Sequence, residues 1–280
     1  MASDEEANFS VTFGQLSMNS VTGVIVFLSL IVFSLVVVSF ANRIQTRNRL
    51  IRQRVQMMRL RIDELEEICA GIEPLLESVF IPKLINEEIL DLIHSVKQLD
   101  ANATFVEVKL EHAKALASKL DAEQRTQPFH RMMPSDAAIA KHKHYLTEAG
   151  RVVRRHQALG RLQNDEMESY VRELSWAYLM IDVISHVTQG HKAVNRDDPI
   201  VAYGYYRRAQ NLLMSAQNPD ERRHRMIREL GEILNGKRLA LSTDLMPETG
   251  FNPKNKPNFS NLSEDDITQL AQIDAGYKAP

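Results

Sequence analysis

The chain lacks several features that common protein classes require. It has a single cysteine, Cys69, among 280 residues, so no disulfide can form within it. None of the motifs GxxxxGK[ST], GxGxxG, GxSxG or HExxH is present, and these would have indicated nucleotide, hydrolase or zinc-protease chemistry. No segment after residue 41 alternates with the period of two that a half-buried strand shows. The sequence therefore predicts an all-α protein, and it gives no catalytic, cofactor-binding or metal-binding residues.

Acidic residues are missing from a long stretch of the chain that follows Glu6. None occurs between Glu6 and Asp63, although the whole chain has a formal net charge of only −2. Basic residues are also absent before Arg43, so residues 7–42 carry no charge. An amphipathic helix of a soluble protein has a polar face, and residues 21–41 show none.

This uncharged region predicts a helix that spans a membrane. Residues 21–41 are mainly valine, isoleucine, leucine and phenylalanine, and about 20 apolar residues suffice to cross the ~30 Å hydrocarbon core of a bilayer. We expect a transmembrane helix at 19–41 after a short extracytoplasmic segment, 1–18. The alternatives are a buried core helix and a cleaved signal peptide with Ser39 and Ala41 at its cleavage site. A signal peptide would have a shorter apolar region that follows basic residues.

Arginines mark the end of the apolar segment and indicate its orientation. The positive-inside rule places an excess of lysine and arginine in the cytoplasm, so we expect an outside N-terminus and a cytoplasmic location for the rest. A bacterial inner membrane is the default location. The same arginines are candidate contacts for anionic lipid headgroups. They are Arg43, Arg47, Arg49, Arg52 and Arg54.

Apolar residues recur every seven positions in the segment 42–73, which predicts a helical, coiled-coil-like stalk. Gly71 and Pro74 are expected to end its helix. One set of heptad positions is Ile44, Ile51, Met58, Leu65 and Ile72, and the second set is Asn48, Val55, Ile62 and Cys69.

Different partners for this seam are open. A parallel homodimer is possible, but arginines would face arginines at its flanking positions, which disfavours it. An antiparallel hairpin with the acidic stretch 75–99 fits the charges better, and contact with lipid headgroups alone is a third alternative. In such a hairpin, three basic residues of the first helix would lie opposite three acidic residues of the second. They are Arg52, Arg54 and Arg59 in the first helix and Glu87, Glu88 and Asp91 in the second.

Residues 74–241 have the 3.6-residue period of amphipathic helices and are expected to form an all-α cytoplasmic domain. The most apolar stretch after the membrane segment, 174–187, is expected at the centre of its core. The helix 105–120 is expected to bury Val108, His112, Leu116 and Leu120. Capping residues and prolines predict further helix starts at Ser135 or Asp136, at Asn164 or Asp165, at Pro199 and at Pro219.

Histidines and further arginines give weak signals. His142 and His144 are two positions apart, so on a helix they face different directions and cannot share a metal ion. His186 and His191 have no cysteine or carboxylate at ligand spacing. Two arginine-rich stretches of the domain lack the interleaved aromatic residues that stack on bases. Binding of nucleic acid is therefore not expected.

One stretch resembles part of a known repeat. Ala202, Tyr206 and Ala209 match A-x3-[FY]-x2-A, and Trp176 and Leu179 match W-x2-L. These patterns are similar to the two helices of a tetratricopeptide unit. The two halves lie further apart than in that family and no second copy is present, whereas repeat arrays need about three units. The resemblance therefore implies one helical hairpin and does not assign the family.

The tail, 242–280, is rich in proline and asparagine and is expected to be flexible. Near its end, LSEDDITQLAQI predicts a short amphipathic helix at 263–274, with Ser263 as its N-cap. A helix this short is marginal alone, so it needs a docking surface on its own domain or in a partner's groove. The expected partner-binding residues are Leu262, Ile267, Leu270 and Ile273.

Together these features favour a non-catalytic function. The first hypothesis is a membrane-anchored scaffold or adaptor whose helical domain and C-terminal segment bind a protein partner. The second is a membrane regulator that responds to anionic lipid through the arginines. The third is an enzyme whose site is assembled from residues distant in the sequence. No cofactor is expected.

Overall fold

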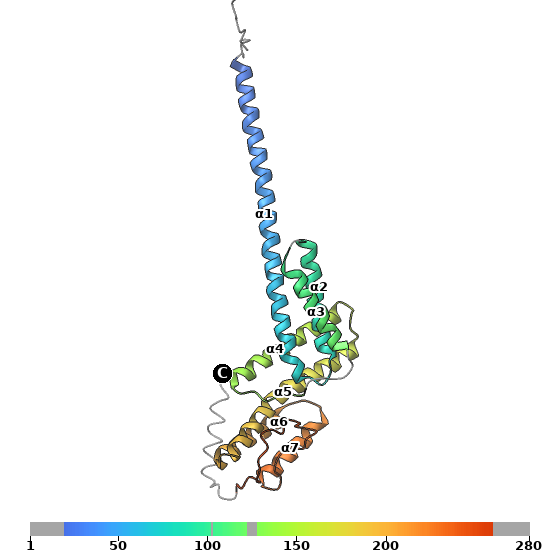
Figure 1. Cartoon of the computed structure of the whole chain (residues 1–280), viewed down its shortest axis with the longest axis vertical. Helices are drawn as coiled ribbons and strands as arrows, with labels where there is room; N and C mark the ends of the chain where they lie inside the picture. The colour runs from blue at the N-terminus through green and yellow to red at the C-terminus, as the bar shows by residue number, and fades with distance from the viewer. Residues whose placement is uncertain (1–19, 102, 122–127, 260–280) are drawn as a thin grey trace, which may run out of the picture. The chain divides into compact units, whose positions relative to one another are not determined.

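The computed structural model describes residues 20–101, 103–121 and 128–259. In these ranges the chain is all-α, as predicted, and contains no strand (Figure 1). The chain divides into two compact units, 1–56 and 57–280, and the boundary falls within the first helix. The elements are α1 (Ser20–Ile72), the short 3-10 helix η1 (Glu73–Leu75), α2 (Phe80–Leu99), α3 (Phe105–Asp121), α4 (Asp136–Ala158), α5 (Asn164–Val194), α6 (Pro199–Ser215) and α7 (Glu221–Leu234).

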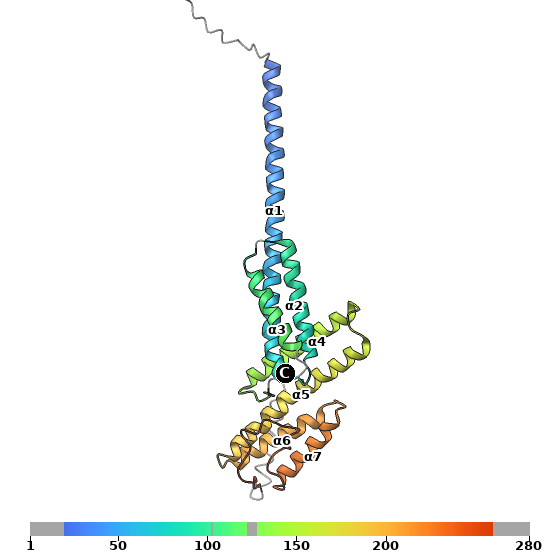
Figure 2. The same ribbon diagram turned by 45° about the vertical axis from the view of Figure 1, so that its right-hand side comes forward.

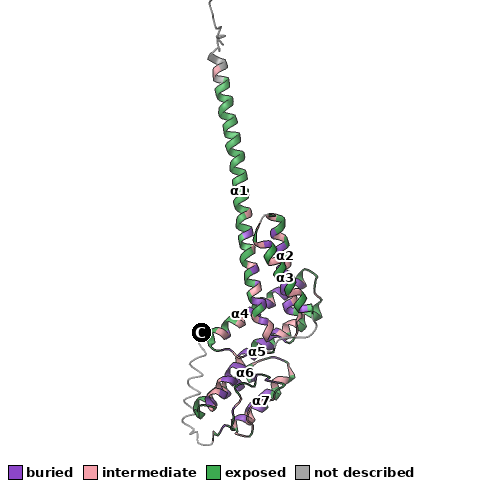
Figure 3. Cartoon of the chain, in the orientation of Figure 1, coloured by how far each residue is buried: buried purple, intermediate pink, exposed green. Residues whose placement is uncertain are grey.

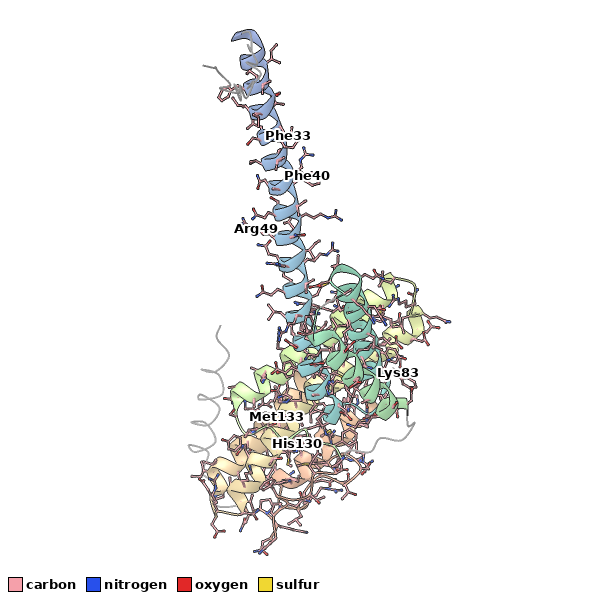
Figure 4. The ribbon with its side chains drawn as sticks, turned by 45° about the horizontal axis from the view of Figure 1, so that its top comes forward. Phe33, Phe40, Arg49, Lys83, His130 and Met133 are labelled. Atoms are coloured by element: carbon pink, nitrogen blue, oxygen red, sulfur yellow. The ribbon has the colours of Figure 1, made fainter. Side chains whose placement is uncertain are left out.

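In its described part, the first unit consists of the portion of α1 that precedes residue 57. Its apolar side chains from Ile25 to Phe40 are exposed, with 66% of Phe27 and 68% of Phe33 accessible, and most of this stretch of α1 is exposed in Figure 3. Phe33 and Phe40 project from the helix in Figure 4. By length and composition, α1 is the one helix of the described chain able to cross a membrane. The predicted segment 1–18 lies outside the described residues.

The last turns of α1 belong to the second unit and form part of its core. Ile62, Leu65, Ile68 and Ile72 are fully buried within a single chain, and Cys69 is 2% exposed. Ile68 lies outside the predicted heptad seam, so the buried face is broader than a coiled-coil seam. α1 ends at Ile72 and η1 follows, as Gly71 and Pro74 predicted.

α2 and α3 lie alongside this end of α1 (Figures 1 and 2). α2 runs back against α1, and the Cys69 thiol lies 3.6 Å from the carbonyl oxygen of Pro82. The carboxylate of Glu173, from α5, holds the turn between them by accepting hydrogen bonds from the backbone N–H groups of Glu77, at 2.8 Å, and Ser78, at 2.7 Å. The expected hairpin of α1 with the following acidic helix is therefore present.

The expected charge partners within this hairpin are wrong. Glu88 pairs with Arg155 and lies 3.5 Å from His156 Nε2, and Asp91 pairs with Arg161. These acids therefore face α4 and the turn after it, whereas Arg59 lies over the ring of Phe105 at 5.0 Å.

The predicted buried stripe of α3 is also partly wrong. Val108 is 69% exposed and His112 is exposed, whereas Val106 and Ala113 are buried together with Leu120. The side of α3 that faces α1 carries Lys109, which lies 2.7 Å from a carboxylate oxygen of Asp63. Val106 and Ala113, three positions before and four after Lys109, lie on this same side of the helix.

α5 connects the two ends of the domain. Its first half packs against α4 and its second half against α6, which in turn packs against α7. The helix starts predicted at Ser135 and Asn164 are confirmed, since Ser135 caps α4 and α5 begins at Asn164. The apolar centre of α5 is buried as predicted, in a core made of Trp176, Met180, Val183, Ile184, Val187, Ala193, Ala202, Tyr206, Ala209, Leu213, Met226, Leu230, Ile233, Leu241, Leu245 and Met246.

The domain extends further than predicted. Residues 242–259 form no helix, but Leu245, Met246 and Glu248 are buried. The ring of Phe259 lies 5.5 Å from that of Tyr203 and 6.2 Å from that of Tyr206. The packed part of the chain therefore continues to residue 259, beyond the boundary expected at residue 241.

The contact between α5 and α6 leaves no room for a side chain at Gly190. A Cβ there would lie 2.6 Å from Cε1 of Tyr206, whose hydroxyl is fixed 2.7 Å from His191 Nδ1. We expect Gly190→Ala to destabilise the domain by about 1–3 kcal/mol through overpacking, measured by denaturant unfolding of the full chain in detergent micelles.

The control for this variant is Gly150→Ala in α4. A Cβ at Gly150 would meet only Leu174, at 3.8 Å, which is an ordinary contact. Alanine is the better helix former by about 1 kcal/mol, so this variant should be neutral or stabilised. Equal destabilisation by both variants would contradict the packing described for Gly190.

Candidate functional site

The predicted orientation residues lie on a single exposed helical segment. Arg43, Arg47, Arg49, Arg52 and Arg54 are all exposed on α1, and Arg49 projects from it in Figure 4. Because no acid occurs between Glu6 and Asp63, no acid in this part of the sequence offsets their charge. The structure thus places these arginines together on one helix, directly after its apolar part.

The predicted partner-binding residues Leu262, Ile267, Leu270 and Ile273 lie outside the described residues. The described chain ends at Phe259, packed on α6 as given above.

A polar cavity of about 390 Å³ lies between the start of α4, the centre of α5 and α6. Residues from three separate parts of the sequence meet there. The cavity is a candidate site for binding a small group, and we call it the α4–α5–α6 cavity. It is lined by Met133, Pro134, Ser135, Asp136, Ile139, Ser185, His186, Gln189 and Tyr205.

His186 is the most deeply placed titratable group of the cavity, with 7% of the residue exposed. Its Nδ1 lies 2.6 Å from the carbonyl oxygen of Asp182, so Nδ1 carries the hydrogen and donates it. Burial lowers the pKa of His186 below its ordinary value, and the charge of Arg208 lowers it further, against the opposing effect of Asp182. The ring is therefore neutral at pH 7, and its Nε2 is a hydrogen-bond acceptor.

The rim of the cavity is held by a buried ion pair. Arg131 Nε and Nη2 donate to the two carboxylate oxygens of Glu248, each at 2.8 Å, and 6% and 3% of the two side chains are exposed. Ser185 Oγ accepts from the backbone N–H of Met133 at 2.9 Å and donates to the carbonyl oxygen of Arg131 at 3.3 Å. Residues 131–133 are thus fixed between α5 and the segment after α7.

The electrostatics of this pair follow from its geometry. Burial alone would raise the pKa of Glu248, but the hydrogen bonds and charge of Arg131 outweigh burial and hold the pKa below its ordinary value. A paired carboxylate inside the protein is therefore charged at neutral pH, and removal of either partner leaves the other buried without compensation.

Spacing in the sequence does not indicate this cavity. Asp182 lies four positions before His186, but its carbonyl oxygen binds the ring and its carboxylate pairs with Lys143. Asp136 reaches the same cavity as His186 from 50 positions away. The feature of the sequence that bears on this cavity is the helix start at Ser135. An N-cap residue followed by an acid places two polar side chains at the first turn of a helix. In the described ranges, no group of three or more His, Cys, Asp or Glu residues is placed to hold a metal ion.

Comparisons of this chain with models of protein families, with curated proteins and with solved structures gave no match.

We expect Glu248→Gln to lower the free energy of unfolding by about 3–5 kcal/mol, because the buried charge of Arg131 loses its partner. The control is Asp121→Asn, which removes an ion pair with Lys83 whose side chains are 45% and 60% exposed and should cost less than about 1 kcal/mol. Chemical unfolding of the full chain measures both. A Glu248→Gln effect no larger than that of the control would contradict a buried pair.

The same pair predicts a pH dependence. Because the pKa of Glu248 is lowered in the folded state, its stabilisation is fully present above the ordinary glutamate pKa and is lost as pH falls through the lowered folded value. In Glu248→Gln this part of the acid-induced loss of stability should be absent, which unfolding curves of both chains across the acidic range will show.

Proposed function

We propose that this protein is a membrane-anchored scaffold or adaptor that holds a helical domain in the cytoplasm, next to the membrane. The observation that carries the proposal is that one helix, α1, supplies both the apolar segment and part of the domain core. Its exposed apolar side chains need a hydrocarbon environment. Its last turns are buried among α2, α3 and α4, so the domain cannot detach from the anchor without exposing that core.

The arginines support an orientation with the N-terminus outside and the domain in the cytoplasm. Five exposed arginines follow the apolar segment, and none precedes it. Moving such a cluster across a bilayer is costly, which is the basis of the positive-inside rule. A bacterial inner membrane fits this arrangement.

A second candidate function is a response to anionic lipid. The arginines of α1 are exposed in a stretch that contains no acid, and each basic residue near an anionic surface contributes about 1 kcal/mol of attraction. This property supports anchoring as well, so we rank it second to the adaptor function.

The orientation can be tested with single cysteines. Cys69 is 2% exposed, and burial raises the pKa of its thiol to about 12, so the unmodified chain should resist labelling. A membrane-impermeant maleimide should label Ser10→Cys in intact cells and should label Thr104→Cys, in the exposed α2–α3 connection, only after lysis. The opposite pattern would show that the domain lies outside.

Binding of a partner through the C-terminal segment can be tested by copurification from native membranes. Because the packed part of the chain extends to Phe259, the informative truncation removes residues 260–280 and leaves the described domain intact. We expect both this truncation and Leu270→Asp to lose the partner, while Gln269→Asp retains it. The reason is that Leu270 lies on the apolar face of the predicted helix and Gln269 does not.

The possible outcomes separate the candidate functions. A partner retained by all variants would move recognition to the helical domain. Recovery of no stoichiometric partner with the full chain would contradict the adaptor function and favour the lipid response. Binding of the full chain to vesicles containing anionic lipid should in that case weaken steeply with salt.

A further inference from the structure

The α4–α5–α6 cavity has more hydrogen-bonding capacity than the described protein uses. Asp136, Gln189 and Tyr205 line it, and no described residue forms a hydrogen bond or ion pair with their side chains. Within the described residues the Nε2 of His186 has no partner either, and it is not among the fully enclosed polar atoms. Four side chains at one cavity thus have hydrogen-bonding groups without a described partner. A few polar groups that converge on one cavity are typical of binding sites.

The chemistry of these groups favours a donor as ligand. The Asp136 carboxylate only accepts hydrogen bonds, and the neutral imidazole of His186 offers Nε2 as an acceptor because Nδ1–H is bound to Asp182. Gln189 and Tyr205 can donate or accept, and Tyr205 also presents an aromatic ring 6.2 Å from that of His186. The side chains that line the cavity thus include two fixed acceptors and no fixed donor.

We propose that the α4–α5–α6 cavity binds a primary ammonium or guanidinium group, with Asp136 as its counter-ion. His186 Nε2 accepts a second N–H of the ligand, and the ring of Tyr205 offers a cation–π contact. Such a group belongs to a free alkylamine or to a lysine or arginine side chain of a protein. The proposal goes beyond the anchoring function and does not depend on the C-terminal segment.

Three features of the surroundings bear on which ligand the cavity can bind. The first N–H groups of α4 attract anions, but the carboxylate of Asp136 lies in the first turn of the same helix and offsets them. Arg208 of α6 is close enough to act on His186 but does not line the cavity. Asp182 of α5 is also close to His186, but its carboxylate is paired with Lys143 and is therefore not a free counter-ion for a ligand.

The test uses the full chain in detergent micelles with isotope-labelled histidine, at pH 7 and followed by NMR. The signal of His186 is assigned by its loss in His186→Gln. The probes are butylamine and methylguanidine for free cations, and the peptides Ac-Gly-Lys-Gly-NH2 and Ac-Gly-Arg-Gly-NH2 for protein side chains. We expect a saturable shift of the His186 signal with at least one cation. Tighter binding of the two free cations would indicate a small-molecule ligand, and tighter binding of the two peptides would indicate a side chain of a protein.

Two variants test the roles of the side chains. Asp136→Asn removes a charge-assisted hydrogen bond and should weaken binding about tenfold or more. Asp165→Asn, which changes an exposed acid in the first turn of α5, is the matched control and should leave binding unchanged. Both variants keep a polar side chain at a helix start, so their folding should be unaffected.

Several results would overturn the proposal. They are the absence of a saturable shift with every cation, an equal effect of Asp136→Asn and Asp165→Asn, and a larger shift with acetate, phosphate or Zn²⁺ than with the cations. A shift with Zn²⁺ alone would assign the cavity to a metal, and a shift with the anions alone would assign it to the start of α4.

Discussion

Burial of the last turns of α1 is the interaction on which the rest of the domain depends. Ile62, Leu65, Ile68 and Ile72 are fully buried, and burying one such side chain contributes about 1.5–3 kcal/mol. α2, α3 and α4 all contact this end of α1, through Pro82, Lys109 and Tyr145 respectively. The domain is therefore completed by the same helix that carries the apolar segment. An isolated domain that began after residue 72 would lack this part of its core.

The features that the sequence predicted are those decided by neighbouring residues. The start of α4 follows from Ser135, whose side chain accepts a hydrogen bond from the N–H of Ala138 three residues later. The start of α6 follows from Pro199, whose fixed φ angle suits the first turn of a helix. The all-α class and the apolar segment likewise depend on local periodicity and length, which are visible without knowledge of distant contacts.

The features that the sequence did not predict depend on which distant residues meet. α3 carries apolar residues on more than one face, and the side turned to α1 is the one on which Lys109 pairs with Asp63 and Glu66. Glu88 had several arginines within reach in the sequence, and its actual partner, Arg155, comes from α4. The composition of the segment after residue 241 indicates flexibility, but Glu248 pairs with Arg131, which lies 117 positions earlier. The α4–α5–α6 cavity was missed for the same reason.

The segment after α7 packs near the α4–α5–α6 cavity at two places. Glu248 fixes Arg131, which lies two residues before Met133, a residue that lines the α4–α5–α6 cavity. Further on, Phe259 packs against Tyr203 and Tyr206 of α6, on either side in sequence of Tyr205, which lines that cavity. Phe259, the last described residue, is therefore packed on the helix that carries Tyr205. The segment 242–259 thus packs against two parts of the chain that line the cavity or adjoin its lining, and its loss would remove support from both.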